Sequence, residues 1–304
     1  MYLIIVLCGC LAILTILSFV SKHIALLRSS VLAYGKLDYT ADQPLTAMAR
    51  WIKNITVPKT WFCHFYAVGL MAAIECIIEI TLALQWKVFG PVLTVLRLWD
   101  TPQGSRHLGL GECLVGLGLM TIHLARRLYE SMMIERPSAN ARMHFSHYLA
   151  GMGFYGAMVI GAWLEGAANF GIWQPIKVVE PFTLPWTTIP SIGLFIYASY
   201  HQHTCHKILA SLRTPKTRNA YVIPRGDWFE NLVVPHYFAD ILVYVSLWIL
   251  YQGRNWTLTF GLVWTIVNLG VTAGETDQWY RKTFGKRYND AFPRSRSLLL
   301  PHIY

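Results

Sequence analysis

Charged residues are scarce in this sequence: of 304 residues only 14% are Asp, Glu, Lys or Arg, whereas 54% are hydrophobic. A soluble domain carries about 25% charged residues, so the composition argues against an ordinary soluble protein. The few charges are unbalanced, with a net charge of +10 at neutral pH. Because the basic residues lie in short stretches between long apolar runs, they indicate a membrane protein and no nucleic-acid partner.

Several signatures of soluble and metal-dependent enzymes are also missing. The sequence contains no GxGxxG or Walker loop, no GxSxG elbow, and no HRD or HExxH motif. This excludes a soluble Rossmann domain, so a nucleotide would have to be held by the membrane domain itself. His201, His203 and His206 come nearest to a metal-ligand set, but only the last two would share a helical face. We therefore predict no metal site.

The cysteines form no CxxC pair and lie mostly in apolar runs, which predicts reduced packing residues. They are Cys8, Cys10, Cys63, Cys76, Cys113 and Cys205. No internal repeat or low-complexity tract divides the chain, so residues 1–304 are predicted to form a single membrane-embedded domain. The first apolar run has no basic segment before it, and we expect it to be retained as a span.

The apolar runs predict an all-α, polytopic protein with about seven transmembrane helices, since a crossing needs about 20 apolar residues. The predicted spans are Leu3–Val20, His64–Leu84, Leu108–Leu124, His147–Glu165, Thr187–Tyr200, His236–Gln252 and Trp256–Ala273. The fifth is the weakest, because Pro185 and Pro190 interrupt it.

The distribution of basic residues predicts the orientation. With seven spans and the N-terminus in the lumen, 21 of the 26 Lys and Arg fall on the cytosolic side, together with the C-terminus. If one helix were omitted, the connections after it would change sides, and the basic residues would no longer collect on one side. The asymmetry therefore supports both the number of spans and the orientation.

Ionisable residues inside the predicted spans have two readings. Such residues are costly in a membrane and often functional, but they also hydrogen-bond to neighbouring helices. The candidates are Glu75, Glu79, Glu112, His123, Glu165 and Asp240.

Arginine, histidine, tyrosine and aspartate gather in the predicted cytosolic connections and in the tail. Some of these residues only anchor the topology, but topology requires charge alone and not the accompanying His, Asp, Tyr and Gly. Arginines bind phosphates through paired hydrogen bonds, and aromatic rings offer flat faces to a nucleotide ring. We therefore predict a cytosolic site for a phosphorylated dinucleotide. Its candidate residues are Arg126, Arg127, His144, Gln202, His206, Arg213, Tyr221, Arg225, Asp227, Trp228, His236, Tyr237, Asp240, Tyr280, Arg294 and Arg296.

Several motifs then resemble a known family. The run from Ile223 to Glu230, followed by Pro235-His-Tyr237 and Asp240, resembles the C-terminal region of the steroid 5-alpha-reductase family, as does the ending from Trp279 to Pro301. Two further motifs, residues 57–66 and Arg126-Arg-Leu-Tyr-Glu130 followed by residues 143–148, resemble its polyprenol (polyprenal) reductase branch. The resemblance runs from about residue 57, and its family-wide part covers about residues 120–304.

The resemblance implies a multi-pass enzyme of the endoplasmic reticulum that binds NADPH and reduces a carbon–carbon double bond conjugated to a carbonyl. The polyprenoid branch implies reduction of polyprenal to dolichal, which supplies dolichol for protein N-glycosylation; no obligate protein partner is evident. Carried over by position, the cofactor residues are Arg126, Arg213, Tyr221, His236, Asp240 and Tyr280.

The chain departs from the family pattern at several positions. Gln202 and His236 stand where the family has Asn, and His206 stands where it has Asp. The Gln-Glu pair that engages a steroid ketone has no counterpart near Trp51. A steroid substrate is therefore disfavoured, and the group that polarises the substrate is left unassigned by the resemblance.

The reaction itself requires a hydrogen-bond donor at the carbonyl oxygen and a proton for the α-carbon. We rank Tyr129 first as the catalytic donor, then His64, then Tyr66, because a neutral side chain donates without the cost of a buried charge. Reduction of a 3-oxo-steroid or an enoyl-CoA is the enzymatic alternative. A seven-helix receptor or transporter is the alternative without catalysis.

Overall fold

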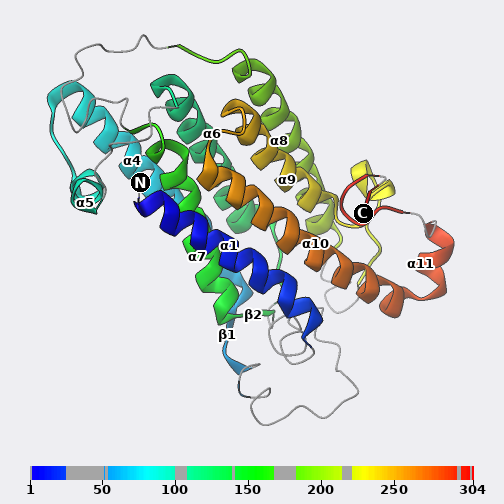
Figure 1. Cartoon of the computed structure of the whole chain (residues 1–304). Coiled ribbons are helices and arrows are strands. Elements are labelled where there is room, and N and C mark those ends of the chain that lie inside the picture. The colour runs from blue at the N-terminus through cyan, green and yellow to red at the C-terminus, as the bar shows by residue number, and fades with distance from the viewer. Residues whose placement is uncertain are drawn as a thin grey trace.

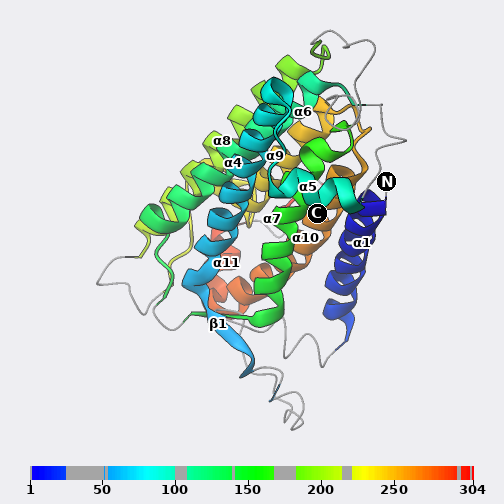
Figure 2. The same cartoon turned by 90° about the vertical axis from the view of Figure 1, so that its left-hand side faces the viewer.

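A computed structural model describes residues 2–24, 51, 54–99, 108–138, 141–167, 183–213, 221–292, 296–301 and 303–304. The described chain is mostly helical, and the long helices run side by side (Figures 1 and 2). The helices are α1 (Tyr2–His23), α4 (Phe62–Trp86), α5 (Pro91–Trp99), α6 (Leu110–Tyr129), α7 (Phe145–Leu164), α8 (Thr188–Ser211), α9 (Pro235–Leu250), α10 (Trp256–Phe284) and α11 (Lys286–Ala291). Each of the seven segments predicted as spans forms one of the helices.

Three of the described helical segments are long and apolar enough to cross a membrane: Tyr2–His23, Lys59–Trp86 and Trp256–Phe284. Pro235–Leu250 is a shorter apolar helix. The architecture is therefore that of a helical membrane protein. The number of seven crossings and their orientation stay predictions.

The fifth predicted span is longer than expected and runs unbroken as α8 to Ser211. Pro190 does not break this helix because it lies in the first turn, where a missing backbone N–H leaves no helical hydrogen bond unmade. The extension carries Gln202 and His206 into the helix, and both become buried.

Two short strands, which the sequence did not predict, join the starts of two helices. Strand β1 (Thr56–Pro58) pairs antiparallel with β2 (Arg142–His144), and the Arg142 guanidinium donates to the Thr56 carbonyl at 2.7 Å. The ladder lies at the opposite end of the bundle from α5 (Figures 1 and 2). It ties the entry of α4 to the entry of α7.

Glutamates within the apolar segments hydrogen-bond to neighbouring elements at the end of the bundle that carries α5. Glu79 accepts from the backbone N–H groups of Val92 and Leu93 at the start of α5. Glu165 likewise accepts from the N–H of Thr257 at the start of α10, and Glu112 accepts from Arg254. Since free N–H groups at a helix start attract an anion, these carboxylates hold the bundle together.

Close helix packing yields a test with a control in the same helix. A Cβ on Gly116 of α6 would lie 1.8 Å from the Tyr251 hydroxyl, which donates to the Ala162 carbonyl at 2.5 Å. Gly118 has no such neighbour within 4 Å. We expect Gly116→Ala to cost about 1–3 kcal/mol of stability through overpacking. Gly118→Ala should be neutral or slightly stabilising, because alanine favours a helix over glycine. Thermal unfolding of the detergent-purified variants measures both, and equal shifts would contradict the packing.

Candidate active site

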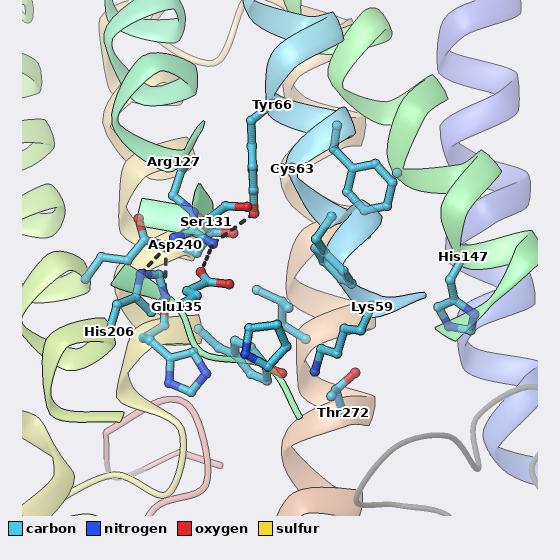
Figure 3. Close-up of a pocket in the computed structure, with 18 of the residues that line it drawn as sticks. Lys59, Cys63, Tyr66, Arg127, Ser131, Glu135, His147, His206, Asp240 and Thr272 are labelled. Carbon is cyan, nitrogen blue, oxygen red and sulfur yellow. Dashed lines mark hydrogen bonds and ion pairs between the residues drawn. The ribbon is translucent and has the colours of Figure 1, made fainter. Parts of the chain in front are cut away.

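A cavity of about 660 Å³ lies at the end of the bundle that carries the β1–β2 ladder. Its walls come from the starts of α4, α7 and α9, the ends of α6 and α8, and the middle of α10 (Figure 3). These are the ends that the charge distribution predicts to be cytosolic. Segments far apart in sequence thus converge on one pocket.

One hydrogen-bonded network lines the polar side of the pocket. The Arg127 guanidinium donates to the Tyr66 hydroxyl at 2.9 Å and to the Glu135 carboxylate at 3.1 Å (Figure 3). It also donates to the Glu130 carboxylate at 2.5 Å. Arg127 also lies over the Tyr66 ring, 4.9 Å from its centroid. Because both side chains are buried, this pairing places the Tyr66 hydroxyl at a defined position in the pocket wall.

Glu130 is the centre of this network. It begins a π-helical turn (Glu130–Ile134) that continues α6 and is closed by a hydrogen bond from the Glu135 N–H to the Glu130 carbonyl. Wider turns of this kind occur often at functional sites. The Glu130 carboxylate is fully buried and lies within 2.9 Å of four cationic or imidazole groups. They belong to Arg126, Arg127, His203 and His206.

These neighbours keep the carboxylate ionised. Burial alone would raise the pKa of the Glu130 carboxyl, but the hydrogen bond with His206 and the charge of Arg127 outweigh it and hold the pKa well below its usual value. For Glu135, burial raises the pKa as well, and the charges of Arg127 and His206 lower it below its ordinary value. Of these two carboxylates, Glu135 lines the pocket and Glu130 is buried next to the lining residue Arg127, and cations already engage both.

A second chain of hydrogen bonds connects α6, α8 and α9. Arg126 donates to the Gln202 side-chain oxygen at 2.5 Å, and the Gln202 amide donates to Asp240 at 2.7 Å. Gln202 and Asp240 both line the cavity. These hydrogen bonds therefore link α6, α8 and α9 at the polar part of the pocket.

Another part of the cavity lining is apolar. It includes Phe65 of α4, Phe154 of α7 and Trp264 and Leu269 of α10. The rings of Phe154 and Trp264 are in contact, with centroids 4.5 Å apart. One pocket therefore combines charged groups, a positioned hydroxyl and a hydrophobic surface, which suits a ligand with a polar head and an apolar chain.

The structure places about half of the predicted site residues in or directly against this pocket. The lining includes Tyr66, Arg127, Gln202, His206, Arg213, His236, Tyr237 and Asp240. Arg126 reaches it through Gln202. Arg294 lies outside the described residues.

The other two predicted catalytic donors do not line the pocket. Tyr129, ranked first from the sequence, is 56% exposed. His64 pairs its Nδ1 with the Tyr148 hydroxyl at 3.2 Å and packs beside Trp61. Of the three candidates, only Tyr66 has its side chain in the pocket wall.

The remaining predicted cofactor residues are not in the pocket lining. His144 caps the start of α7, and Arg225 pairs with Glu230. Tyr221 packs edge-on against Trp279. Tyr280, in turn, packs against Tyr288.

Asp227 and Trp228 hold the loop before α9 to α8. Asp227 accepts from the His201 ring at 2.9 Å, and Trp228 stacks on that ring with centroids 4.1 Å apart. Arg296 donates to the carbonyls of Phe229 and Leu232, which ties the tail to the same loop. These contacts stabilise the fold around the pocket.

Sequence reasoning missed four charged residues in or next to the pocket: Lys59, Glu130, Glu135 and Arg136. Glu130 carried a signal, because a carboxylate three and four residues after two arginines on a helix pairs with both. Lys59 lies in the motif at residues 57–66, but nothing in the sequence indicates where its side chain points.

The fold and the site define a multi-helix membrane protein with a pocket at one end of its bundle. The lining of this pocket is partly charged and partly apolar. Comparison with known proteins agrees with this class. A family model described as 3-oxo-5-alpha-steroid 4-dehydrogenase matches residues 154–304. Polyprenal reductase 1 of Oryza sativa subsp. indica is 30% identical over 290 residues, covering 82% of this chain and 80% of the relative.

Two further relatives extend the match. Polyprenal reductase 1 of Arabidopsis thaliana is 29% identical over 96% of this chain and 93% of its own length. Polyprenal reductase of Xenopus tropicalis is 29% identical over 90% of this chain and 87% of its own length. The chain belongs to the steroid 5-alpha-reductase family, and the three relatives compared are polyprenal reductases. It is therefore an oxidoreductase of a family that acts on carbon–carbon double bonds.

Proposed function

We propose that this chain is an NADPH-dependent reductase that converts polyprenal to dolichal by reducing the α-isoprene double bond. The observation that carries the proposal is the pocket itself. It combines the Tyr66 hydroxyl, held by Arg127, with a cationic side and an apolar wall. The similarity to polyprenal reductases supports the same substrate class.

The residues present fit a phosphorylated dinucleotide. The cavity carries Lys59, Arg136 and Arg213 for phosphate oxygens, and Gln202 and His236 for polar groups of a nucleotide. NADPH bound there would supply the hydride. The protein would have to orient the substrate, stabilise the charge that develops on it and provide a proton.

Tyr66 meets the requirement for the donor. When hydride adds to the β-carbon of a conjugated aldehyde, negative charge moves to the carbonyl oxygen and an enolate forms. The Tyr66 hydroxyl can donate to that oxygen, and the Arg127 guanidinium behind it stabilises negative charge on the phenol oxygen. An isolated allylic alcohol offers no such place for the charge, so the chemistry favours the aldehyde over polyprenol.

The substrate would place its aldehyde near Tyr66 and its isoprenoid chain along Phe65, Phe154 and Trp264. We further propose seven crossings with the N-terminus in the lumen of the endoplasmic reticulum and the pocket toward the cytosol. The excess of basic residues at the pocket end supports this orientation. In this setting the enzyme would supply dolichol for protein N-glycosylation.

A substrate comparison tests the proposal. With NADPH, the purified protein should convert polyprenal to dolichal, and turnover should be at least about tenfold slower with a 3-oxo-steroid enone or an enoyl-CoA, whose non-reacting parts differ from an isoprenoid chain. Product is measured by mass spectrometry. Equal or faster turnover of polyprenol, with aldehyde formation excluded, would contradict the aldehyde mechanism. Membership in an oxidoreductase family argues against the receptor or transporter alternative.

A further inference from the structure

Three cations from three separate elements line the cavity: Lys59, Arg136 and Arg213. Lys59 belongs to a 3₁₀ turn (Lys59–Trp61) before α4, Arg136 follows the π-helical turn, and Arg213 follows the end of α8. None of the three forms an ion pair with a carboxylate among the described residues. Arg136 donates only a long hydrogen bond, 3.4 Å, to the Arg213 carbonyl.

The nearby carboxylates are already engaged. Glu135 pairs with Arg127, and Glu130 is surrounded by Arg126, Arg127 and two histidines. Among the described residues, Lys59, Arg136 and Arg213 thus have no carboxylate at ion-pairing distance, and Glu135, whose charge also acts on Lys59, is shared with Arg127. Clustering like charges in a partly enclosed site is unfavourable unless an anion binds there.

The position of Lys59 is set by the two-stranded ladder. Its backbone N–H donates to the Ala141 carbonyl at 2.8 Å, directly after the pairing of Pro58 with Arg142. Its ammonium group points into the cavity, on the side of Thr272 (Figure 3). The ladder thus positions Lys59 in the same cavity as Arg213. Lys59 is not among the cofactor residues predicted from the sequence.

We propose that Lys59, together with Arg136 and Arg213, forms a phosphate-binding site in which Lys59 determines the affinity for the phosphorylated cofactor. Two arginine forks and a lysine ammonium match the oxygens of a phosphate, which needs more donors than a carboxylate does. This inference rests on the proposed function for the cofactor as the source of the phosphate. The phosphate is either the 2′-phosphate or the diphosphate of the dinucleotide.

Binding measurements test this without requiring turnover. Dissociation constants of NADPH, NADH and inorganic pyrophosphate are measured by titration calorimetry on the full-length, detergent-purified wild type, Lys59→Gln and Lys207→Gln. Lys207 is an exposed lysine of α8 that does not line the cavity, so its variant controls for the loss of one positive charge. We expect Lys59→Gln to weaken NADPH binding about tenfold or more and Lys207→Gln to leave it unchanged.

The three ligands and the variants together distinguish the possible results. Weaker binding of NADPH but not of NADH by Lys59→Gln assigns the lysine to the 2′-phosphate, and equal weakening of both assigns it to the diphosphate. Unchanged affinity for all three probes would overturn the proposal.

If wild type binds pyrophosphate in a Lys59-dependent way but not NADPH, the phosphate site stands and the proposed cofactor fails. If wild type binds none of the probes, both fail. Lys59→Met, with matching unfolding temperatures, repeats the test should Lys59→Gln fold poorly.

Discussion

Replacing Tyr66 by phenylalanine should lower kcat for polyprenal by about 100- to 10,000-fold, the range that a positioned acid contributes. The substitution removes one oxygen from the pocket wall and keeps the ring that packs against Tyr155 with centroids 5.2 Å apart. The Arg127 guanidinium retains its carboxylate partners Glu130 and Glu135. The affinity for NADPH should therefore stay within about twofold of the wild type, since the lost interaction acts on the developing charge of the substrate.

Tyr129→Phe is the matched comparison for this prediction. The sequence ranks Tyr129 as the first donor, whereas the structure leaves it 56% exposed and outside the pocket lining. Steady-state kinetics with both variants therefore decide whether Tyr129, ranked first from the sequence, or Tyr66, which lines the pocket, is the donor. A large loss of kcat for Tyr129→Phe, with Tyr66→Phe close to the wild type, would contradict the assignment of Tyr66.

Glu130→Gln should lower activity about 100-fold, because small displacements of positioned groups cost that much. The carboxylate is fully buried and contacts Arg126, Arg127, His203 and His206. A neutral amide offers one acceptor to this group and leaves buried positive charge without its partner. Removing one member of a buried ion pair costs about 3–5 kcal/mol, so the unfolding temperature should fall as well.

A surface glutamate provides the control for Glu130. Glu230 pairs with Arg225 at 2.9 Å, but both side chains are about half exposed. An exposed pair contributes about 0–1 kcal/mol, so Glu230→Gln should change the unfolding temperature little. Kinetics and thermal unfolding of the two variants measured together test the role of Glu130. If both variants lose the same stability and retain activity, Glu130 does not organise the site.

Much of the fold could be predicted because its signals are local. Twenty consecutive apolar residues favour a helix wherever they occur, and each of the seven predicted spans coincides with a helix. Pro190 weakened the prediction for α8, since the sequence did not show that this proline falls in the first turn. The β1–β2 ladder could not be predicted, because it pairs strands that are 86 residues apart (Thr56 and Arg142).

The candidate site could be predicted in part for a similar reason. The motifs around Arg127, Gln202 and Asp240 identified residues that do line the pocket. The sequence could not rank Tyr66 above Tyr129, since which face of a helix is buried depends on the neighbours it packs against. Tyr66 meets Arg127 across 61 residues of sequence, and no spacing rule reports such a contact.

The sequence by itself therefore determined a basic, helical membrane protein with one charged end and the motifs of a reductase family. Hydropathy and charge determine, for each residue separately, whether lipid or water is favourable. They can therefore be used for prediction without knowing which helices are in contact. The tertiary structure alone decided which polar groups come together: Glu130 at the centre of the cations, the Tyr66 hydroxyl against Arg127, and Lys59 in the same cavity as Arg213. These assignments depend on distances between side chains from different helices, and only packing sets those distances.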